Sequence, residues 1–133
     1  ELLRVVSALP GEALPGGPQG SVDLVLTSPP YMTETHHEAD PLTAYERNGG
    51  DYTRYLAEIG LVAAQCAQLL RPDGFAVWNV ADIDYMGHTT HLIADCNQVL
   101  TAHLVPLGIT VIEWDKLPHD LVADALLVFQ RAT

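Results

Sequence analysis

The chain has 133 residues, of which 48% are hydrophobic and 17% are charged. This length fits one domain with a real core, and the composition excludes a mostly disordered chain, because disorder requires few apolar residues and dense charge. No apolar run approaches the ~20 residues that cross a bilayer, so we expect no membrane-spanning segment. The formal net charge is −11, so the surface as a whole repels phosphate backbones and is no general nucleic-acid-binding face.

The first part of the chain alternates short apolar runs with loops. Residues 2–8 are rich in β-branched side chains and predict a strand, and residues 9–20 are rich in proline and glycine and predict a loop. Residues 22–27 form a short apolar run that two prolines end, which favours a buried parallel strand. Residues 31–50 are polar and lack periodicity, and loops of that length in compact domains tend to be functional.

A helix and a strand are expected next. Apolar side chains recur at three- and four-residue steps over residues 51–70, which predicts a helix. The sequence Arg-Pro-Asp-Gly over residues 71–74 ends it. Residues 75–80 are apolar and predict the next buried strand, and we expect a loop over residues 81–87.

A second helix is expected from a cap at Thr89 or Thr90 to about Leu104, because its apolar residues again recur on one face. The two cysteines, Cys66 and Cys96, fall one in each helical stretch and form no CxxC pair. We interpret both as free thiols in the core of a cytoplasmic protein.

Two further strands complete the predicted order. Gly108 ends the second helical unit, and strands are expected over residues 109–114 and 125–130. Strands that alternate with helices imply an α/β fold with a mixed, mostly parallel sheet that is covered on both faces. The last two strands are joined by too few residues for a crossover helix, so they are expected to form an antiparallel hairpin at the sheet edge.

The most informative stretch is Thr27-Ser28-Pro29-Pro30-Tyr31, directly after the second predicted strand. In an open α/β sheet, ligands bind just beyond the carboxyl ends of the parallel strands, so we expect this stretch at the ligand-facing edge. Consecutive prolines fix two φ angles and hold the preceding residues extended. The sequence therefore predicts a rigid turn with outward carbonyls, flanked by a small hydroxyl and an aromatic ring.

Such a turn suits the recognition of an exocyclic amine on a nucleobase. The lone pair of that nitrogen is delocalised into the ring, and two acceptors can draw the nitrogen toward a more nucleophilic, pyramidal geometry. The Ser28 hydroxyl and the Pro29 carbonyl are candidate acceptors, and Tyr31 is a candidate stacking platform for a flipped or single-stranded base. The alternative is a rigid strand-ending turn with a packed tyrosine.

The segment SVDLVLTSPPY over residues 21–31 resembles the catalytic motif of S-adenosylmethionine-dependent DNA amino-methyltransferases, with a serine similar to that of the cytosine-N4 branch. Four more segments resemble pieces of this family in the expected order: GEAL (11–14), LLRPDGFAVWNV (69–80), VIEWDKLP (111–118) and ALLVFQRA (125–132). The resemblance implies a Rossmann-like methyltransferase sheet, S-adenosylmethionine as methyl donor and DNA as substrate. It also implies that Ser28 and Pro29 accept from the target amine, Pro30 holds the turn and Tyr31 stacks on the base.

The chain departs from this family in its cofactor and recognition regions. The acid-Pro-Phe-x-Gly-x-Gly motif and the target-recognition region are not visible in residues 1–133, so we expect one domain that corresponds to a catalytic half, a partial fold. Candidate cofactor-binding residues are Glu12, Thr27 and Asn79. Glu12 stands where the family usually has Asp. Asn79 is expected at the end of its strand, where it lines the pocket or satisfies a backbone group.

Two other functions stay open at this point. One is a non-catalytic or complementing methyltransferase-fold domain that pairs with another chain or forms a homodimer, which the absent motif and the charge of −11 favour. The other is an RNA or protein amino-methyltransferase, although Ser28 stands where that group usually has Asp or Asn. His88, His91 and Asp95 share a predicted helix face, but their pattern is weak and we expect no metal site.

Overall fold

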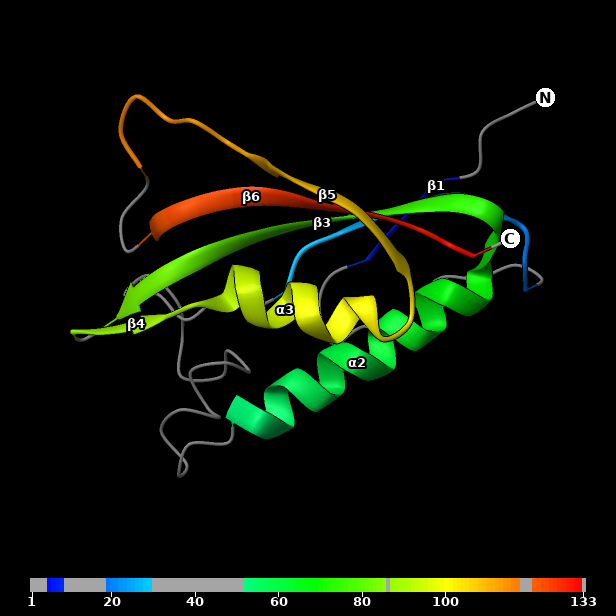
Figure 1. Cartoon of the computed structure of the whole chain (residues 1–133), viewed down its shortest axis with the longest axis horizontal. Helices are drawn as coiled ribbons and strands as arrows, with labels where there is room; N and C mark the ends of the chain where they lie inside the picture. Colours follow the sequence, from blue (N-terminus) through cyan, green and yellow to red (C-terminus); the bar gives the residue numbers. More distant parts are fainter. Residues whose placement is uncertain (1–4, 9–18, 30–51, 86, 118–120, 133) are drawn as a thin grey trace.

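The computed structural model of the chain describes residues 5–8, 19–29, 52–85, 87–117 and 121–132 (Figure 1). Its strands are β1 (Val5–Ala8), β2 (Val22–Thr27), β3 (Leu70–Tyr85), β4 (His88–Thr90), β5 (Val105–Val111) and β6 (Leu121–Gln130). Its helices are α2 (Tyr52–Leu69) and α3 (Leu92–Thr101). Among the described helices, none combines the length and apolar character that a bilayer crossing requires.

The strands form one mixed sheet in the order β1-β2-β3-β6-β5, with β4 paired to β3. The pairs β1–β2 and β2–β3 are parallel. The pairs β3–β4, β3–β6 and β5–β6 are antiparallel. The mixed α/β sheet with an antiparallel C-terminal hairpin at its edge is therefore confirmed. The expectation of a mostly parallel sheet is wrong, because antiparallel pairs outnumber parallel ones among the described strands. Strand β6 lies antiparallel beside β3, and β4 also pairs antiparallel with β3.

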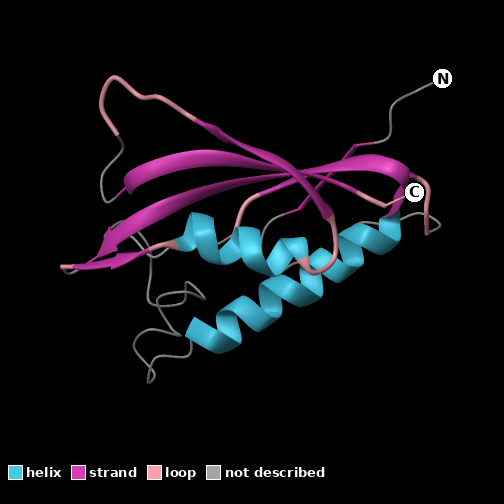
Figure 2. Ribbon diagram, in the orientation of Figure 1, coloured by secondary structure: helices cyan, strands magenta, loops and turns pink. Residues whose placement is uncertain are grey.

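Both described helices lie on one face of the sheet, which we call the helix face (Figure 2). Strand residues of this face are fully buried against α2 and α3: Val25, Ala76, Trp78, Val80, Leu127 and Phe129. Cross-strand register places a second set of apolar residues on the opposite face, the open face: Leu24, Leu26, Phe75, Val77, Leu126 and Val128. The expectation that helices cover both faces is not met among the described residues.

Strands β3, β5 and β6 have boundaries that differ from the sequence-based expectations. Strand β6 begins at Leu121 instead of residue 125, and β3 begins at Leu70 instead of residue 75. Strand β3 continues through residues 81–85, where a loop was expected. The reason is an alternating pattern in which Ala81 and Ile83 are buried and Asp82 and Asp84 are not. Strand β5 occupies Val105–Val111 instead of residues 109–114. Its proline and glycine are tolerated because β5 is an edge strand.

The start of α3 is held by a residue distant in sequence. The helix begins after His91, whose side chain makes no capping hydrogen bond, and the expected cap at Thr89 or Thr90 is wrong because both residues belong to β4. Instead, the Ile93 backbone N–H donates to Asp82 Oδ1 at 2.9 Å. A carboxylate on β3 thus satisfies a donor of the helix N-terminus, where negative charge is also favoured.

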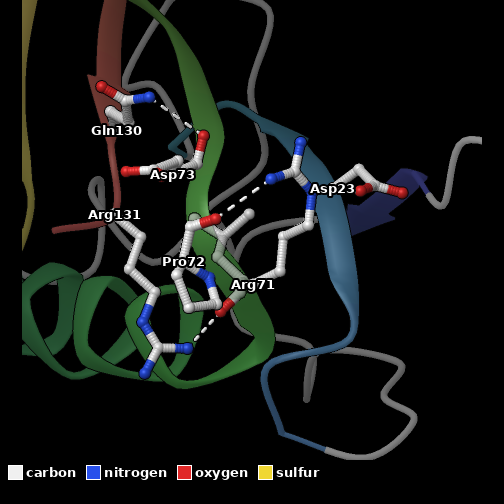
Figure 3. A network of polar contacts seen from close by, with 7 residues as sticks. Asp23, Arg71, Pro72, Asp73, Gln130 and Arg131 are labelled. Carbon is white, nitrogen blue, oxygen red and sulfur yellow. Dashed lines mark hydrogen bonds and ion pairs between the residues drawn. The ribbon is translucent and has the colours of Figure 1, made fainter. Parts of the chain in front are cut away.

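Polar contacts join β2, β3 and β6 at the amino end of the parallel strands (Figure 3). Arg71 pairs with the Asp23 carboxylate and donates from Nη1 to the Pro72 carbonyl at 3.0 Å. Gln130 Nε2 donates to the carbonyl of Asp73, a residue near the start of β3 with a φ of 65°. Side chains at this end of the sheet are therefore engaged with other residues of the chain. The opposite, carboxyl end of the parallel strands is the candidate ligand edge.

Candidate functional site

The Ser28–Pro29 turn follows β2 at the carboxyl edge of the parallel pair β2–β3. Ser28 is half-buried, Pro29 is buried, and the preceding Thr27 lies beside Trp78 in register. No hydrogen bond joins the Ser28 hydroxyl to another residue in the described part of the chain. Ser28 and Pro29 therefore lie directly after a strand, as expected, and the rigid turn predicted from Ser28 to Tyr31 stays a prediction. Pro30, Tyr31 and Glu12 lie outside the described residues.

A buried indole lies next to this turn. Trp78 is 1% exposed and belongs to the core. Its Nε1–H finds no hydrogen-bond partner among the described residues. A buried donor left unpaired costs about 1–3 kcal/mol, so this indole N–H is an exception among buried polar groups. No pattern in the amino-acid sequence pointed to this orphaned donor.

Asn79 is placed differently from the expectation. It lies within the 16-residue strand β3 and not at its carboxyl end. Its Nδ2 group donates to Asp124 Oδ1 at 2.8 Å and to the Ala125 carbonyl at 3.0 Å. Because Thr27 pairs with Trp78, the neighbouring Asn79 points to the opposite face of the sheet from Thr27. The structure therefore brings these two candidate cofactor-binding residues to adjacent strands, but not to one side of the sheet.

A tryptophan and a buried aspartate form a second group of interest that sequence reasoning missed. Trp114 Nε1 donates to Asp124 Oδ2 at 3.0 Å, and both residues line a hollow of about 380 Å³, the Trp114 hollow. Asp124 is 6% exposed. The two residues are ten positions apart and on different sides of a hairpin, so no local motif connects them.

The histidine-rich stretch before α3 lines a further hollow, of about 360 Å³. Its walls include Tyr52, His88, His91 and Asp95, and the Tyr52 hydroxyl donates to Asp95 Oδ2 at 2.7 Å. Within the described residues, no group of three or more His, Cys, Asp or Glu side chains is arranged to hold a metal ion. The carboxylate of this hollow, that of Asp95, is already engaged by the tyrosine.

The two thiols are free and buried, as predicted. Burial raises the pKa of Cys66 to about 12. Burial, with a smaller contribution from the carboxylates of Asp95 and Asp82, raises the pKa of Cys96 to about 12. Both groups therefore stay protonated at neutral pH, and neither is suited to act as a nucleophile.

Comparison with known proteins identifies the fold. No family model and no curated protein matches the chain. Among solved structures, a "Putative DNA Modification Methylase" from Thermus thermophilus matches with a TM-score of 0.66 and 22% identity, over 99% of this chain and 55% of that one. The same protein complexed with S-adenosyl-L-methionine matches with a TM-score of 0.62 and 20% identity, over 99% and 56% of the two chains.

These matches show that the chain has a methyltransferase-type α/β fold. The chain spans about half the length of the Thermus protein, so it corresponds to a part of that fold. The expected fold class, a partial Rossmann-like methyltransferase sheet, is confirmed.

Proposed function

We propose that the chain serves S-adenosylmethionine-dependent methylation of an exocyclic amine in DNA, with cytosine N4 favoured over adenine N6. The observation that carries this proposal is the Ser28–Pro29 turn at the carboxyl edge of the parallel strands. The fold in which this segment lies supports DNA as the substrate class, since the matching Thermus protein is described as a putative DNA modification methylase. The complex of that protein with S-adenosyl-L-methionine supports the donor.

The chemistry assigned to this chain is positioning of the amine. The Ser28 hydroxyl and the Pro29 carbonyl each accept one N–H of the target amine, which draws the nitrogen toward a pyramidal geometry with its lone pair directed away from these two acceptors. Pro30 keeps the turn rigid, and Tyr31 stacks on the base, which is flipped out of the duplex or already single-stranded. No strong general base is required, because a methylated ammonium loses its proton readily.

The two described candidates for donor binding, Thr27 and Asn79, do not converge on one site. Thr27 and Asn79 point to opposite faces of the sheet, and the Asn79 amide is engaged by Asp124 and Ala125. Donor binding by Glu12, Thr27 and Asn79 therefore stays a prediction, and no chemical step is assigned to the donor here. When bound, S-adenosylmethionine would supply the electrophilic methyl group.

The charge of the chain restricts how it meets DNA. With a net charge of −11, long-range attraction to a phosphate backbone is absent. The proposed contact is therefore confined to the target base at the Ser28–Pro29 turn, with phosphate contacts supplied by other groups. A cytoplasmic location fits two buried free thiols and is part of the same proposal.

The open face favours a second candidate function, a complementing methyltransferase-fold unit that acts with another chain or a second copy. Leu26 and Phe75, on adjacent strands of this face, are each 40% exposed. Apolar surface that is continuous across strands favours burial against a partner. Under this candidate, the partner would supply the donor-binding half and cover the open face.

Methyl incorporation tests the leading proposal. The chain is incubated with S-adenosylmethionine labelled in the methyl group and with a single-stranded oligonucleotide that contains cytosine and adenine. Mass spectrometry of the hydrolysed product should then show N4-methylcytosine. Parallel reactions contain RNA or protein in place of the oligonucleotide. Transfer of the labelled methyl group to RNA or protein, with none to DNA, would contradict the proposal of a DNA substrate.

The complementing candidate makes a separate prediction. Under it, the chain alone transfers no methyl group, and sedimentation at rising concentration shows self-association through the open face or association with an added donor-binding half. Substitution of Phe75 by Asp should abolish that association. A monomer that methylates DNA unaided would rule this candidate out.

A further inference from the structure

The Trp114 hollow presents an aromatic ring that is fixed at one edge and exposed elsewhere. Trp114 follows β5 and is 49% exposed, yet its Nε1–H is held by Asp124 Oδ2 at 3.0 Å. Asp124 is in turn held by Asn79 Nδ2 at 2.8 Å, and its backbone carbonyl accepts from the Ile112 N–H at 2.9 Å. The exposed ring is therefore anchored in one orientation, which reduces the entropy lost when a ligand stacks on it.

The carboxyl group of Asp124, at the edge of the indole ring, has no cationic partner in the described part of the chain. Asp124 is 6% exposed, and the donors that reach it, from Trp114 and Asn79, are neutral groups. No ion pair joins Asp124 to a Lys, Arg or His in the described part of the chain. Each carboxylate oxygen keeps a further lone pair. Buried charges are normally paired, so a cation that enters this hollow would be stabilised.

The rest of the hollow combines apolar walls with a second acid. It has a volume of about 380 Å³, within the range of small-ligand pockets. The apolar wall residues Val111 and Val122 are exposed, and Glu113 adds a carboxylate that is open to solvent. An aromatic face, aliphatic walls and two carboxylates together suit a flat organic cation with an apolar stem.

We propose that the Trp114 hollow binds an arginine side chain of a basic partner polypeptide. A guanidinium is planar, so it can stack on the indole face while its N–H groups donate to Glu113 and Asp124. Lysine offers a point charge without a stacking plane and should bind less well. The net charge of −11 favours a basic partner over a nucleic acid, whose phosphates would meet the acidic side chains of Glu113 and Asp115. This proposal does not depend on the amine chemistry at Ser28.

Tryptophan fluorescence of the full chain tests the proposal directly. Trp78 is 1% exposed, so a change in emission on ligand addition reports mainly on Trp114. The probes are three blocked tripeptides, Gly-X-Gly, in which X is arginine, lysine or citrulline. Citrulline keeps the planar shape of arginine and removes the charge. We expect a saturable change with the arginine peptide and about tenfold weaker binding of the citrulline peptide.

Substitutions locate the binding. Glu113→Gln removes one carboxylate at the surface and should weaken binding of the arginine peptide about threefold to tenfold. Trp114→Ala should abolish measurable binding of the arginine peptide, with calorimetry as the readout because this variant lacks the fluorescent reporter. The matched control is Glu58→Gln, which removes the same charge from the exposed surface of α2 and should leave the affinity unchanged.

Three results would overturn the proposal. One is no saturable response to the arginine peptide at low salt. Another is equal affinity for the arginine and citrulline peptides, which would show that charge plays no part. The third is binding of a single-stranded oligonucleotide that depends on Trp114 while the arginine peptide does not bind, which would make the ring a platform for nucleobases.

Discussion

The two faces of the sheet differ in how completely they are covered. On the helix face, Trp78 and Phe129 are 1% and 0% exposed, and residues of α2 and α3 pack against them. On the open face, Phe75 is 40% exposed although it lies one residue from Ala76, which is fully buried. The same strands thus present a finished core on one side and an apolar surface in contact with solvent on the other.

This difference shows which face of the sheet is stabilised by contacts within the chain. Burial of apolar surface on the helix face supplies stability that a chain of this size can generate alone. The open face contributes less, because its side chains keep much of their contact with water. The contrast agrees with a chain that spans about half the length of the methylase that it resembles in structure. Four sets of measurements, ordered by expected effect, test the contrast.

The largest effect is expected from a matched pair of phenylalanines. Phe129→Ala should lower the free energy of unfolding by about 3–5 kcal/mol, because it leaves a cavity in a closed core. Phe75→Ala should cost about 1 kcal/mol or less, because the ring is 40% exposed and no cavity is enclosed. Urea unfolding of both variants measures the difference. Equal losses would mean that the open face is packed as tightly as the helix face.

The glycines extend the comparison to the backbone. A Cβ at Gly74 would lie 2.9 Å from the Arg71 carbonyl oxygen and 3.2 Å from that of Asp23, so Gly74→Ala should cost about 1–3 kcal/mol. A Cβ at Gly108, which pairs with Val128 of the open face, would meet nothing within 4 Å. Gly108→Ala should therefore change stability by about 0.5 kcal/mol or less. Thermal unfolding followed by circular dichroism compares the two, and a neutral Gly74→Ala would refute the close approach.

A smaller effect is expected at the cap of α3 on the helix face. Asp82→Ala removes the acceptor of the Ile93 N–H and should destabilise the chain by about 1 kcal/mol. Asp84→Ala removes the same charge from a position two residues further along β3 and serves as the control. Hydrogen exchange of the first amides of α3 should quicken only in the Asp82 variant. Faster exchange in both variants would point to net charge instead of capping.

The smallest effect at neutral pH concerns the thiols of the helix face. Burial raises the pKa of Cys66 and Cys96 to about 12, from a usual value of 9.0. Because the native state holds these protons more tightly, stability should be unaffected below pH 9 and should fall as the pH rises from 9 toward 12. Dithionitrobenzoate at about pH 8 should react slowly with the native chain and rapidly after unfolding. Rapid reaction of the native protein would mean that the helix face opens readily.

Local sequence predicted what local forces determine. Apolar periodicity predicted α2. An apolar run ended by prolines predicted β2 with the same first and last residues as in the structure. The end of β2 before Ser28 and Pro29 was placed correctly, because the restriction that prolines impose on the backbone is local. The continuation of β3 over Ala81–Tyr85 was missed, although the alternation of Ala81 and Ile83 with Asp82 and Asp84 was a usable signal.

The features that were missed depend on contacts between distant residues. The capping of α3 by Asp82 joins two elements, so the nearer Thr89 and Thr90 were preferred. The position of β5 was missed because Pro106 and Gly108 usually break strands, and only an edge location admits them. The Asn79–Asp124–Trp114 contacts join β3 to the β5–β6 hairpin, and no spacing in the sequence announces them.

The role of the Ser28 hydroxyl is tested most directly by comparing two serine variants at opposite ends of β2. Methyl transfer from labelled S-adenosylmethionine to a cytosine-containing single-stranded oligonucleotide is measured for the wild type, Ser28→Ala and Ser21→Ala. Loss of one positioned hydrogen-bond partner should lower the rate about 10²-fold in Ser28→Ala, and the rate of Ser21→Ala should equal that of the wild type. Equal rates in Ser28→Ala and the wild type would contradict the assignment of Ser28 as an acceptor of the target amine.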